Sequence, residues 1–153
     1  MPRTVDKQLA AGLGISGAIL LEGPRGCGKT MTGLHHSASA VFLDDLAIQE
    51  MLNVDPGIAL NGQSPRLVDE WQLEPRMWNL VRRRVDALDG FGHFILTGSS
   101  VPDDDMTRHF GAARFLRIHQ RTMTWYEKDQ GEPTVSLEGL FNGDLVEPTT
   151  NTY

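Results

Sequence analysis

The sequence has no basic excess, no second cysteine and no long apolar run. Its 14 Lys and Arg residues are outnumbered by 20 Asp and Glu residues, so charge gives no general basis for binding nucleic acid, which stays unproven as a partner. The single cysteine, Cys27, excludes an internal disulfide and fits a reducing cytoplasm. No apolar run approaches the roughly 20 residues that a membrane-spanning helix requires. We therefore expect a cytoplasmic protein with no membrane partner.

One segment matches a phosphate-binding motif in full. Residues Gly23–Thr30 read Gly-Pro-Arg-Gly-Cys-Gly-Lys-Thr, which fits the pattern G-x-x-x-x-G-K-[ST], also called Walker A. An apolar, strand-like run, Ala18–Leu21, precedes the motif, and a helix start follows it. This context favours a phosphate-binding loop, or P-loop. The alternative is a glycine-rich turn that only caps a helix, but such a turn requires neither the lysine nor the threonine.

Each residue type in the loop has a physical use. Glycines 23, 26 and 28 allow the backbone to curl, so that its N–H groups approach phosphate oxygens. The following helix adds unpaired N–H groups and its positive dipole end. Lys29 is expected at the β- and γ-phosphates, and Thr30 offers a hydroxyl to Mg²⁺. The predicted nucleotide-binding residues are Gly23, Pro24, Arg25, Gly26, Cys27, Gly28, Lys29, Thr30 and Met31.

Strand-like and helical segments alternate along the chain, which is typical of a parallel sheet with helices on both faces. We expect strands at residues 15–21, 41–43, 66–68, 91–96 and 114–118, and helices at 4–13, 28–36, 46–52, 78–88 and around 125–126. The sequence therefore predicts an α/β fold of the P-loop NTPase type, a three-layer sandwich around a mostly parallel sheet of about five strands. We expect residues 1–142 to form this nucleotide-binding core and residues 143–153, which are polar, to form a disordered tail.

Two acidic residues follow the third expected strand. Residues Pro65–Glu70 have the form of a Walker B element, in which an apolar strand ends in carboxylates. Asp69 would hold Mg²⁺, and Glu70 would orient the attacking water and accept its proton. A buried strand that ends in two acids at a solvated edge is also common without any function, so the P-loop upstream supplies most of the support for this interpretation.

Hydroxyl groups follow the fourth expected strand, in the run Thr97-Gly98-Ser99-Ser100. Because the carboxyl ends of parallel strands meet at one edge, Thr97 or Ser99 is expected near the attacking water or the γ-phosphate, as a sensor of that phosphate. The alternative is a turn built on Gly98, in which the serines only cap the loop.

With these three elements, the chain is similar to a group of prokaryotic AAA-type ATP-binding proteins of poorly defined cellular role. The resemblance covers nearly the whole chain and includes Gly23–Thr30, the Val68-Asp69-Glu70-Trp71-Gln72 element with Pro75 and Trp78-Asn79 behind it, Phe94–Ser100, and Arg108–Glu127 with Gly111, Arg114 and a Met-Thr-Trp-Tyr-Glu turn. Members of this family usually carry a second, C-terminal domain of unknown function. The resemblance implies that this chain corresponds to the N-terminal ATPase core, with ATP and Mg²⁺ as its ligands.

The chain also departs from that family pattern. Ala113-Arg114 stands where Gly-Arg is common, and a proline is expected near Thr122. AAA-type ATPases usually need a helical lid and an arginine that reaches the γ-phosphate from a neighbour. Arg108 and Arg114 are candidates for that arginine, and loop solvation or strand-edge pairing explains them about equally well.

Two functions from different classes follow from these residues. The first is an Mg²⁺-dependent ATPase, in which Lys29 holds the phosphates, Thr30 and Asp69 hold the metal, Glu70 positions water, and Thr97 or Ser99 senses the γ-phosphate. The second is an ATP-binding switch or interaction module with little turnover, whose partner, a second copy or another protein, the sequence leaves open. A small-molecule kinase would need an arginine-rich lid, and a GTPase would need an Asn-Lys-x-Asp element that the sequence lacks.

Overall fold

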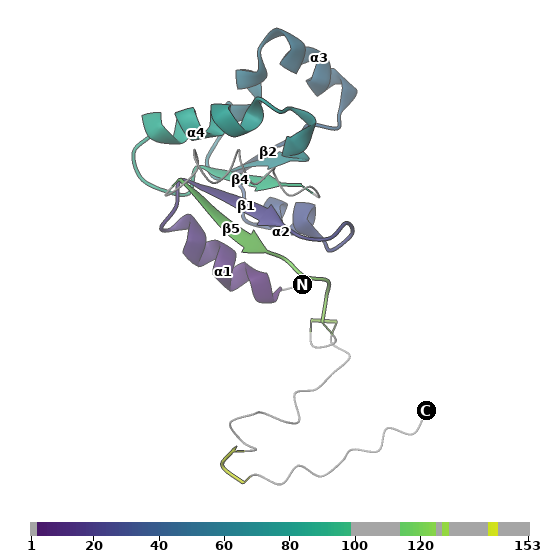
Figure 1. Ribbon diagram of the computed structural model, residues 1–153, viewed down its shortest axis with the longest axis vertical. Coiled ribbons are helices and arrows are strands. Elements are labelled where there is room, and N and C mark those ends of the chain that lie inside the picture. The colour runs from purple at the N-terminus through teal and green to yellow at the C-terminus, as the bar shows by residue number, and fades with distance from the viewer. Residues whose placement is uncertain (1–2, 99–113, 125–126, 129–140, 144–153) are drawn as a thin grey trace. The chain divides into compact units, whose positions relative to one another are not determined.

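The computed structural model describes residues 3–98, 114–124, 127–128 and 141–143 (Figure 1). Ser99, Arg108 and Gly111, the helix expected at Trp125-Tyr126 and nearly all of the tail expected from residue 143 lie outside the described residues. The chain divides into two compact units, Pro2–Thr122 and Met1 with Met123–Tyr153. In the second unit, Glu127 accepts hydrogen bonds from the backbone N–H and hydroxyl of Thr124 at 2.8 and 3.1 Å.

The first unit is built on a parallel sheet of five strands in the order β2-β3-β4-β1-β5. The strands are β1 (Ala18–Glu22), β2 (Ser39–Phe42), β3 (Arg66–Asp69), β4 (Phe94–Thr97) and β5 (Phe115–His119). The helices are α1 (Thr4–Leu13), α2 (Lys29–His35), α3 (Leu46–Val54) and α4 (Met77–Ala87), with the 3₁₀ helices η1 (Pro56–Leu60) and η2 (Trp71–Leu73). The predicted five-stranded parallel sheet is confirmed.

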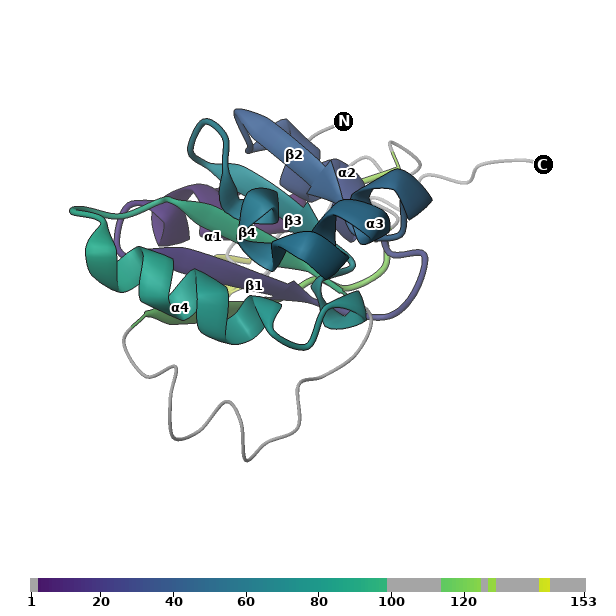
Figure 2. The same ribbon diagram turned by 90° about the horizontal axis from the view of Figure 1, so that it is seen from above.

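Helices cover both faces of the sheet, which confirms the predicted three-layer α/β sandwich. Side chains of β1 alternate between two cores: Ala18 and Leu20 belong to the cluster formed with α3, η1 and α4, and Ile19 and Leu21 belong to the cluster under α1. Figure 1 shows α3 and α4 on one side of the strands and α1 and α2 on the other, and Figure 2 looks down on α3 and α4.

Two strands begin three residues later than the sequence predicts. The strand expected at 15–21 starts at Ala18, because the amides of Ile15 and Ser16 still bond to the carbonyl of Gly12 at the end of α1, at 3.1 and 3.0 Å. The strand expected at 91–96 starts at Phe94, because Gly92 adopts a left-handed φ of +72° and Phe91 is exposed. Hydrophobicity alone did not distinguish these turn residues from strand residues.

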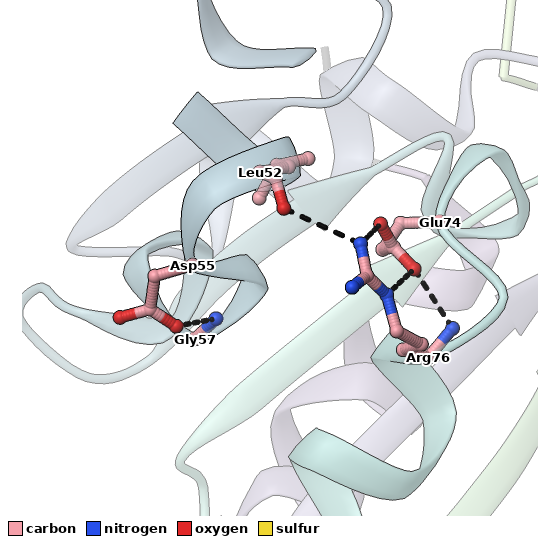
Figure 3. A network of polar contacts seen from close by, with 5 residues as sticks. All are labelled: Leu52, Asp55, Gly57, Glu74 and Arg76. Carbon is pink, nitrogen blue, oxygen red and sulfur yellow. Dashed lines mark hydrogen bonds and ion pairs between the residues drawn. The ribbon is translucent and has the colours of Figure 1, made fainter. Parts of the chain in front are cut away.

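A polar network joins the end of α3 to the start of α4 (Figure 3). Arg76 donates to Glu74 through Nε and Nη2, both at 2.7 Å, and through Nη2 to the carbonyl of Leu52 at 3.3 Å. These hydrogen bonds with Arg76 lower the pKa of the Glu74 carboxyl. Nearby, Asp55 accepts from the Gly57 N–H at 2.8 Å and thereby begins η1, where the sequence predicted only a turn.

Candidate functional site

The predicted site residues lie where the central strands end. Register aligns Leu21 of β1 with Thr97 of β4, and Thr97 with Asp69 of β3, so these three residues form a row across the sheet. Asp69 shares a face of β3 with Leu67, and α2 packs on that face so closely that a Cβ at Gly33 would lie 2.7 Å from Leu67 Cδ1. The first turn of α2 is therefore brought beside Asp69 and Thr97.

The segment between β1 and α2 forms a tight loop, as the motif predicts. Gly28 is the N-cap of α2 and adopts a left-handed conformation with φ +89° and ψ 23°. Glycine adopts that conformation without the steric cost that a side chain adds. The Cys27 amide donates to the Pro24 carbonyl at 3.3 Å and closes a turn within the loop.

Lys29 reaches back across the loop that precedes it. Its ammonium donates to the carbonyls of Gly23 and Pro24, both at 2.9 Å, and to Cys27 Sγ at 3.8 Å. The side chain is buried, with 8% of its surface exposed. An ammonium has three donors, and here the third meets sulfur, which is a weak acceptor. A phosphate oxygen at this place would be a better, charge-assisted partner.

Thr30, Asp69 and Thr97 meet at one carboxylate oxygen. Thr30 Oγ1 donates to Asp69 Oδ1 at 2.9 Å, and Thr97 Oγ1 donates to the same oxygen. Asp69 is 6% exposed. The predicted metal residues Thr30 and Asp69 are thus brought together, and their hydroxyl and carboxylate oxygens are the hard donors that Mg²⁺ prefers. The hydroxyl of Thr97, which with Ser99 was one of two candidates to sense the γ-phosphate, is directed to Asp69.

The two oxygens alone do not complete a metal coordination shell. In the described part of the chain, no group of three or more His, Cys, Asp or Glu side chains is arranged to hold a metal ion. Mg²⁺ commonly takes only one or two protein ligands and fills the rest with water and substrate phosphates. The donor set here fits that kind of site and does not fit a cage made by the protein alone.

Glu70, the predicted base, occupies a constrained backbone position. It has φ +54° and ψ 43°, and it is the one left-handed residue other than glycine in the part of the chain that the structure covers. Its carboxylate accepts a hydrogen bond from Gln72 Nε2. The other amide atom, Gln72 Oε1, is buried with no hydrogen-bond partner among the described residues, and a Cβ at Gly98 would overlap it.

Three residues at this edge of the sheet have roles that the sequence did not reveal. Gln72 donates a hydrogen bond to Glu70, and the sequence placed it in the Val68–Gln72 element without assigning it a role. Arg3 and Gln120 both donate to the carbonyl of Cys27, inside the P-loop, although they lie at opposite ends of the first unit. No local pattern connects residues 3 and 120 with the loop.

Other predicted residues lie farther from this cluster or outside it. Pro24, Arg25 and Gly26 are exposed at the surface of the loop. Met31 is 70% exposed on α2, and Cys27 is buried. Ser99 lies outside the described residues.

Arg114, a candidate for the arginine at the γ-phosphate, lies at the amino end of the parallel strands, opposite the edge where the Gly23–Gly28 loop of its own chain lies. Its carbonyl accepts a hydrogen bond from the backbone N–H of Ala18, the first residue of β1, at 3.0 Å, and its Nε donates to Asp86 in the last turn of α4. The P-loop follows Glu22, at the other end of the same strand. Arg114 therefore does not reach the loop of its own chain, its role toward a neighbouring copy stays a prediction, and Arg108 is outside the described residues.

No family model matches the chain, and a comparison with curated proteins gives no significant match. Among the helices of the described residues, none is long and apolar enough to cross a bilayer.

Proposed function

We propose that this protein binds ATP with Mg²⁺ and hydrolyses it, as an AAA-type core located in the cytoplasm. One observation carries the proposal: Lys29 closes over the loop of Gly23–Gly28 while the next residue, Thr30, is bonded to Asp69. A helix-capping turn needs neither contact. A loop of backbone amides, an ammonium and a hydroxyl–carboxylate pair at one sheet edge are the groups that a nucleoside triphosphate with its metal requires.

Each residue has a separate task in this proposal. The loop amides and Lys29 bind the phosphate chain and offset its negative charge. Thr30 and Asp69 would hold Mg²⁺, which neutralises charge on the phosphates when bound. Thr97 fixes the carboxylate of Asp69 through its hydroxyl.

Glu70 acts on water in the chemical step. Its carboxylate accepts a proton from a water molecule whose oxygen forms a new bond to the γ-phosphorus. The bond from that phosphorus to the bridging oxygen breaks, so the products are ADP and phosphate. Gln72 holds one oxygen of Glu70 and leaves the other oxygen for water.

A second function, an ATP-binding switch with little turnover, follows if no neighbouring copy supplies an arginine, because Arg114 does not reach the loop of its own chain. Its pairing with Asp86, at the opposite end of the sheet from the loop, gives the site no arginine from that strand. An arginine finger contributes about 10³–10⁵ to turnover in related nucleotide hydrolases, so its absence would leave binding without rapid hydrolysis.

Two variants separate these functions from each other and from a loop that binds nothing. Calorimetric titration with Mg-ATP and phosphate release would be measured for the parent, for Lys29→Ala and for Glu70→Gln. We expect Lys29→Ala to weaken ATP binding by about tenfold or more. We expect Glu70→Gln to bind ATP normally and lose about 10²–10⁴ in turnover.

The exposed Lys7 of α1 provides a matched control, because Lys7→Ala removes a cation elsewhere on the surface. If Lys29→Ala and Lys7→Ala bind ATP equally well, the nucleotide site is assigned to the wrong residues. If the parent binds ATP but releases phosphate no faster than Glu70→Gln, the switch is the correct function and the ATPase is not.

A further inference from the structure

One carbonyl in the P-loop accepts hydrogen bonds from two side chains that are far apart in the sequence, near the start and the end of the first unit. Arg3 Nη1, just before α1, donates to the Cys27 oxygen at 3.0 Å. Gln120 Nε2, just after β5, donates to the same oxygen at 2.8 Å. Both acceptor lone pairs of this carbonyl are therefore used, and one donor is charged.

The planarity of the peptide bond gives this contact a consequence for the next residue. In a trans peptide the C=O and the following N–H point in opposite directions. Holding the Cys27 oxygen toward Arg3 and Gln120 therefore directs the Gly28 N–H away from both. That N–H has no acceptor among the described residues, and it belongs to the loop whose amides the proposed function assigns to the phosphates.

Gly28 is also the place where this peptide would turn most easily. Its left-handed φ of +89° is accessible to glycine along with many other conformations. A rotation of the Cys27–Gly28 peptide would turn its oxygen, rather than its N–H, toward a phosphate. Two external donors on the Cys27 oxygen oppose that rotation.

The two side chains belong to one continuous support behind the loop. Arg3 also donates through Nη2 to the Arg121 backbone carbonyl at 3.0 Å. The backbone N–H of Gln120 donates to the Glu22 backbone carbonyl at 2.7 Å. The Gln120 carbonyl lies so close to Gly23 that a Cβ there would overlap it. The planar guanidinium of Arg3 thus bridges the loop, at Cys27, and the segment after β5, at Arg121. A lysine ammonium does not reproduce this geometry.

The burial of Gln120 argues that stability alone does not explain it. Gln120 is 1% exposed, and its Oε1 has no hydrogen-bond partner among the described residues. An unpartnered buried amide oxygen is destabilising, so an apolar side chain of similar length would suit the fold at least as well.

We infer that Arg3 and Gln120 are positioning residues, which hold the Cys27–Gly28 peptide in its phosphate-binding orientation and thereby set the affinity for nucleoside di- and triphosphates. This inference rests on the proposed nucleotide function. It assigns to both residues an effect on ligand binding through the loop, without contact between either side chain and the ligand.

The test uses substitutions that keep size and remove donors. Gln120→Met removes the Nε2 donor and the unpartnered oxygen together, and Arg3→Met removes both guanidinium bonds. Titration with Mg-ADP and Mg-ATP is expected to show binding about tenfold weaker for each variant, with similar factors for the two nucleotides. Thermal unfolding of Gln120→Met without nucleotide is expected at the parent's temperature or above it.

Two controls distinguish this role from charge and from general loss of a glutamine. Arg3→Lys keeps the positive charge but cannot bridge Cys27 and Arg121, so it is expected to bind as weakly as Arg3→Met. Gln49→Met removes another glutamine amide that donates to a backbone carbonyl, that of Leu43 at 3.0 Å, and is expected to leave nucleotide affinity unchanged.

Three results would overturn the inference. Parent-like affinity in Gln120→Met, or recovery of affinity in Arg3→Lys, would exclude the orienting role, as would weaker binding in Gln120→Met that is accompanied by a lower unfolding temperature. Failure of this inference alone would appear as lost binding in Lys29→Ala with parent-like binding in Gln120→Met. If the parent binds neither nucleotide, the proposed function and this inference both fail.

Discussion

Thr30 Oγ1 and Asp69 Oδ1 are 2.9 Å apart and hydrogen-bonded, so the first turn of α2 is tied to the end of β3. The bond connects the helix that follows the Gly23–Gly28 loop with the acidic end of β3, although 39 positions separate the two residues. The strand register explains their proximity, because Asp69 and its neighbour Thr97 face α2 at the carboxyl edge of the sheet. Whatever α2 binds at its first turn is thereby linked to Asp69.

Thr30→Val is expected to remove much of the effect of Mg²⁺ on ATP binding. Valine keeps the shape of threonine but offers no oxygen to the metal. ATP affinity would be titrated with Mg²⁺ and with excess EDTA. We expect binding about tenfold weaker than the parent's with the metal and little change without it. Equal strengthening by Mg²⁺ in the variant and the parent would remove Thr30 from the metal site.

Glu70→Gly is expected to be more stable than Glu70→Ala and to abolish turnover. Glu70 has a left-handed φ of +54°, which costs a residue with a side chain more than it costs glycine. Relative to Glu70→Ala, which keeps the strain and also lacks the carboxylate, we expect a free energy of unfolding higher by about 1 kcal/mol. Urea denaturation measures the difference. Equal stabilities of the two variants would show that this backbone position carries no strain.

The Glu74–Arg76 pair is expected to make stability depend on acid pH. The pKa of Glu74 lies below its ordinary value of 4.5 because of the hydrogen bonds from Arg76. A lowered carboxyl pKa in the folded state stabilises the fold above the unfolded-state pKa, and this contribution is lost as the pH falls through the folded-state value. Glu74→Gln should therefore destabilise the protein at pH 7, on the order of 1 kcal/mol.

The difference in the free energy of unfolding between Glu74→Gln and the parent should become smaller as the pH falls below about 4.5. Denaturant midpoints of both proteins, measured from pH 7 down to about pH 2, would follow this change. A difference that stays constant across the range would mean that Glu74 acts through its shape and not through its charge.

Gly17→Ala is expected to destabilise the fold by about 1–3 kcal/mol through overpacking. A Cβ at Gly17, just before β1, would overlap Cγ1 of Val85 in α4, whose β-branched side chain cannot easily move aside. Gly14→Ala is a suitable control, because its Cβ would meet only the Ala11 carbonyl at 3.4 Å. Adding Val85→Ala to Gly17→Ala should restore part of the lost stability, which thermal unfolding would measure. No recovery would place the cause elsewhere.

The sequence was most informative where structure is local. The bounds of α1 were predicted in full, because Val5 and Leu9 repeat at helical spacing and glycines follow. The loop between β1 and α2 was likewise predicted from its motif. Strand order was not predicted. The contacts of Arg3 and Gln120 were not predicted either, since these residues are 24 and 93 positions from Cys27, which they contact. Such pairs depend on how the strands are arranged, and no local pattern encodes that arrangement.

The position of β1 in the sheet has a consequence for synthesis of the chain. It is the first of the described strands to be translated, yet its neighbours in the sheet are β4 and β5, the last two strands that the structure describes. A nascent chain on the ribosome would therefore carry this apolar strand with both edges unpaired until nearly the whole domain has emerged. A chaperone that shields extended apolar segments would therefore find its target in β1 until β5 had joined the sheet.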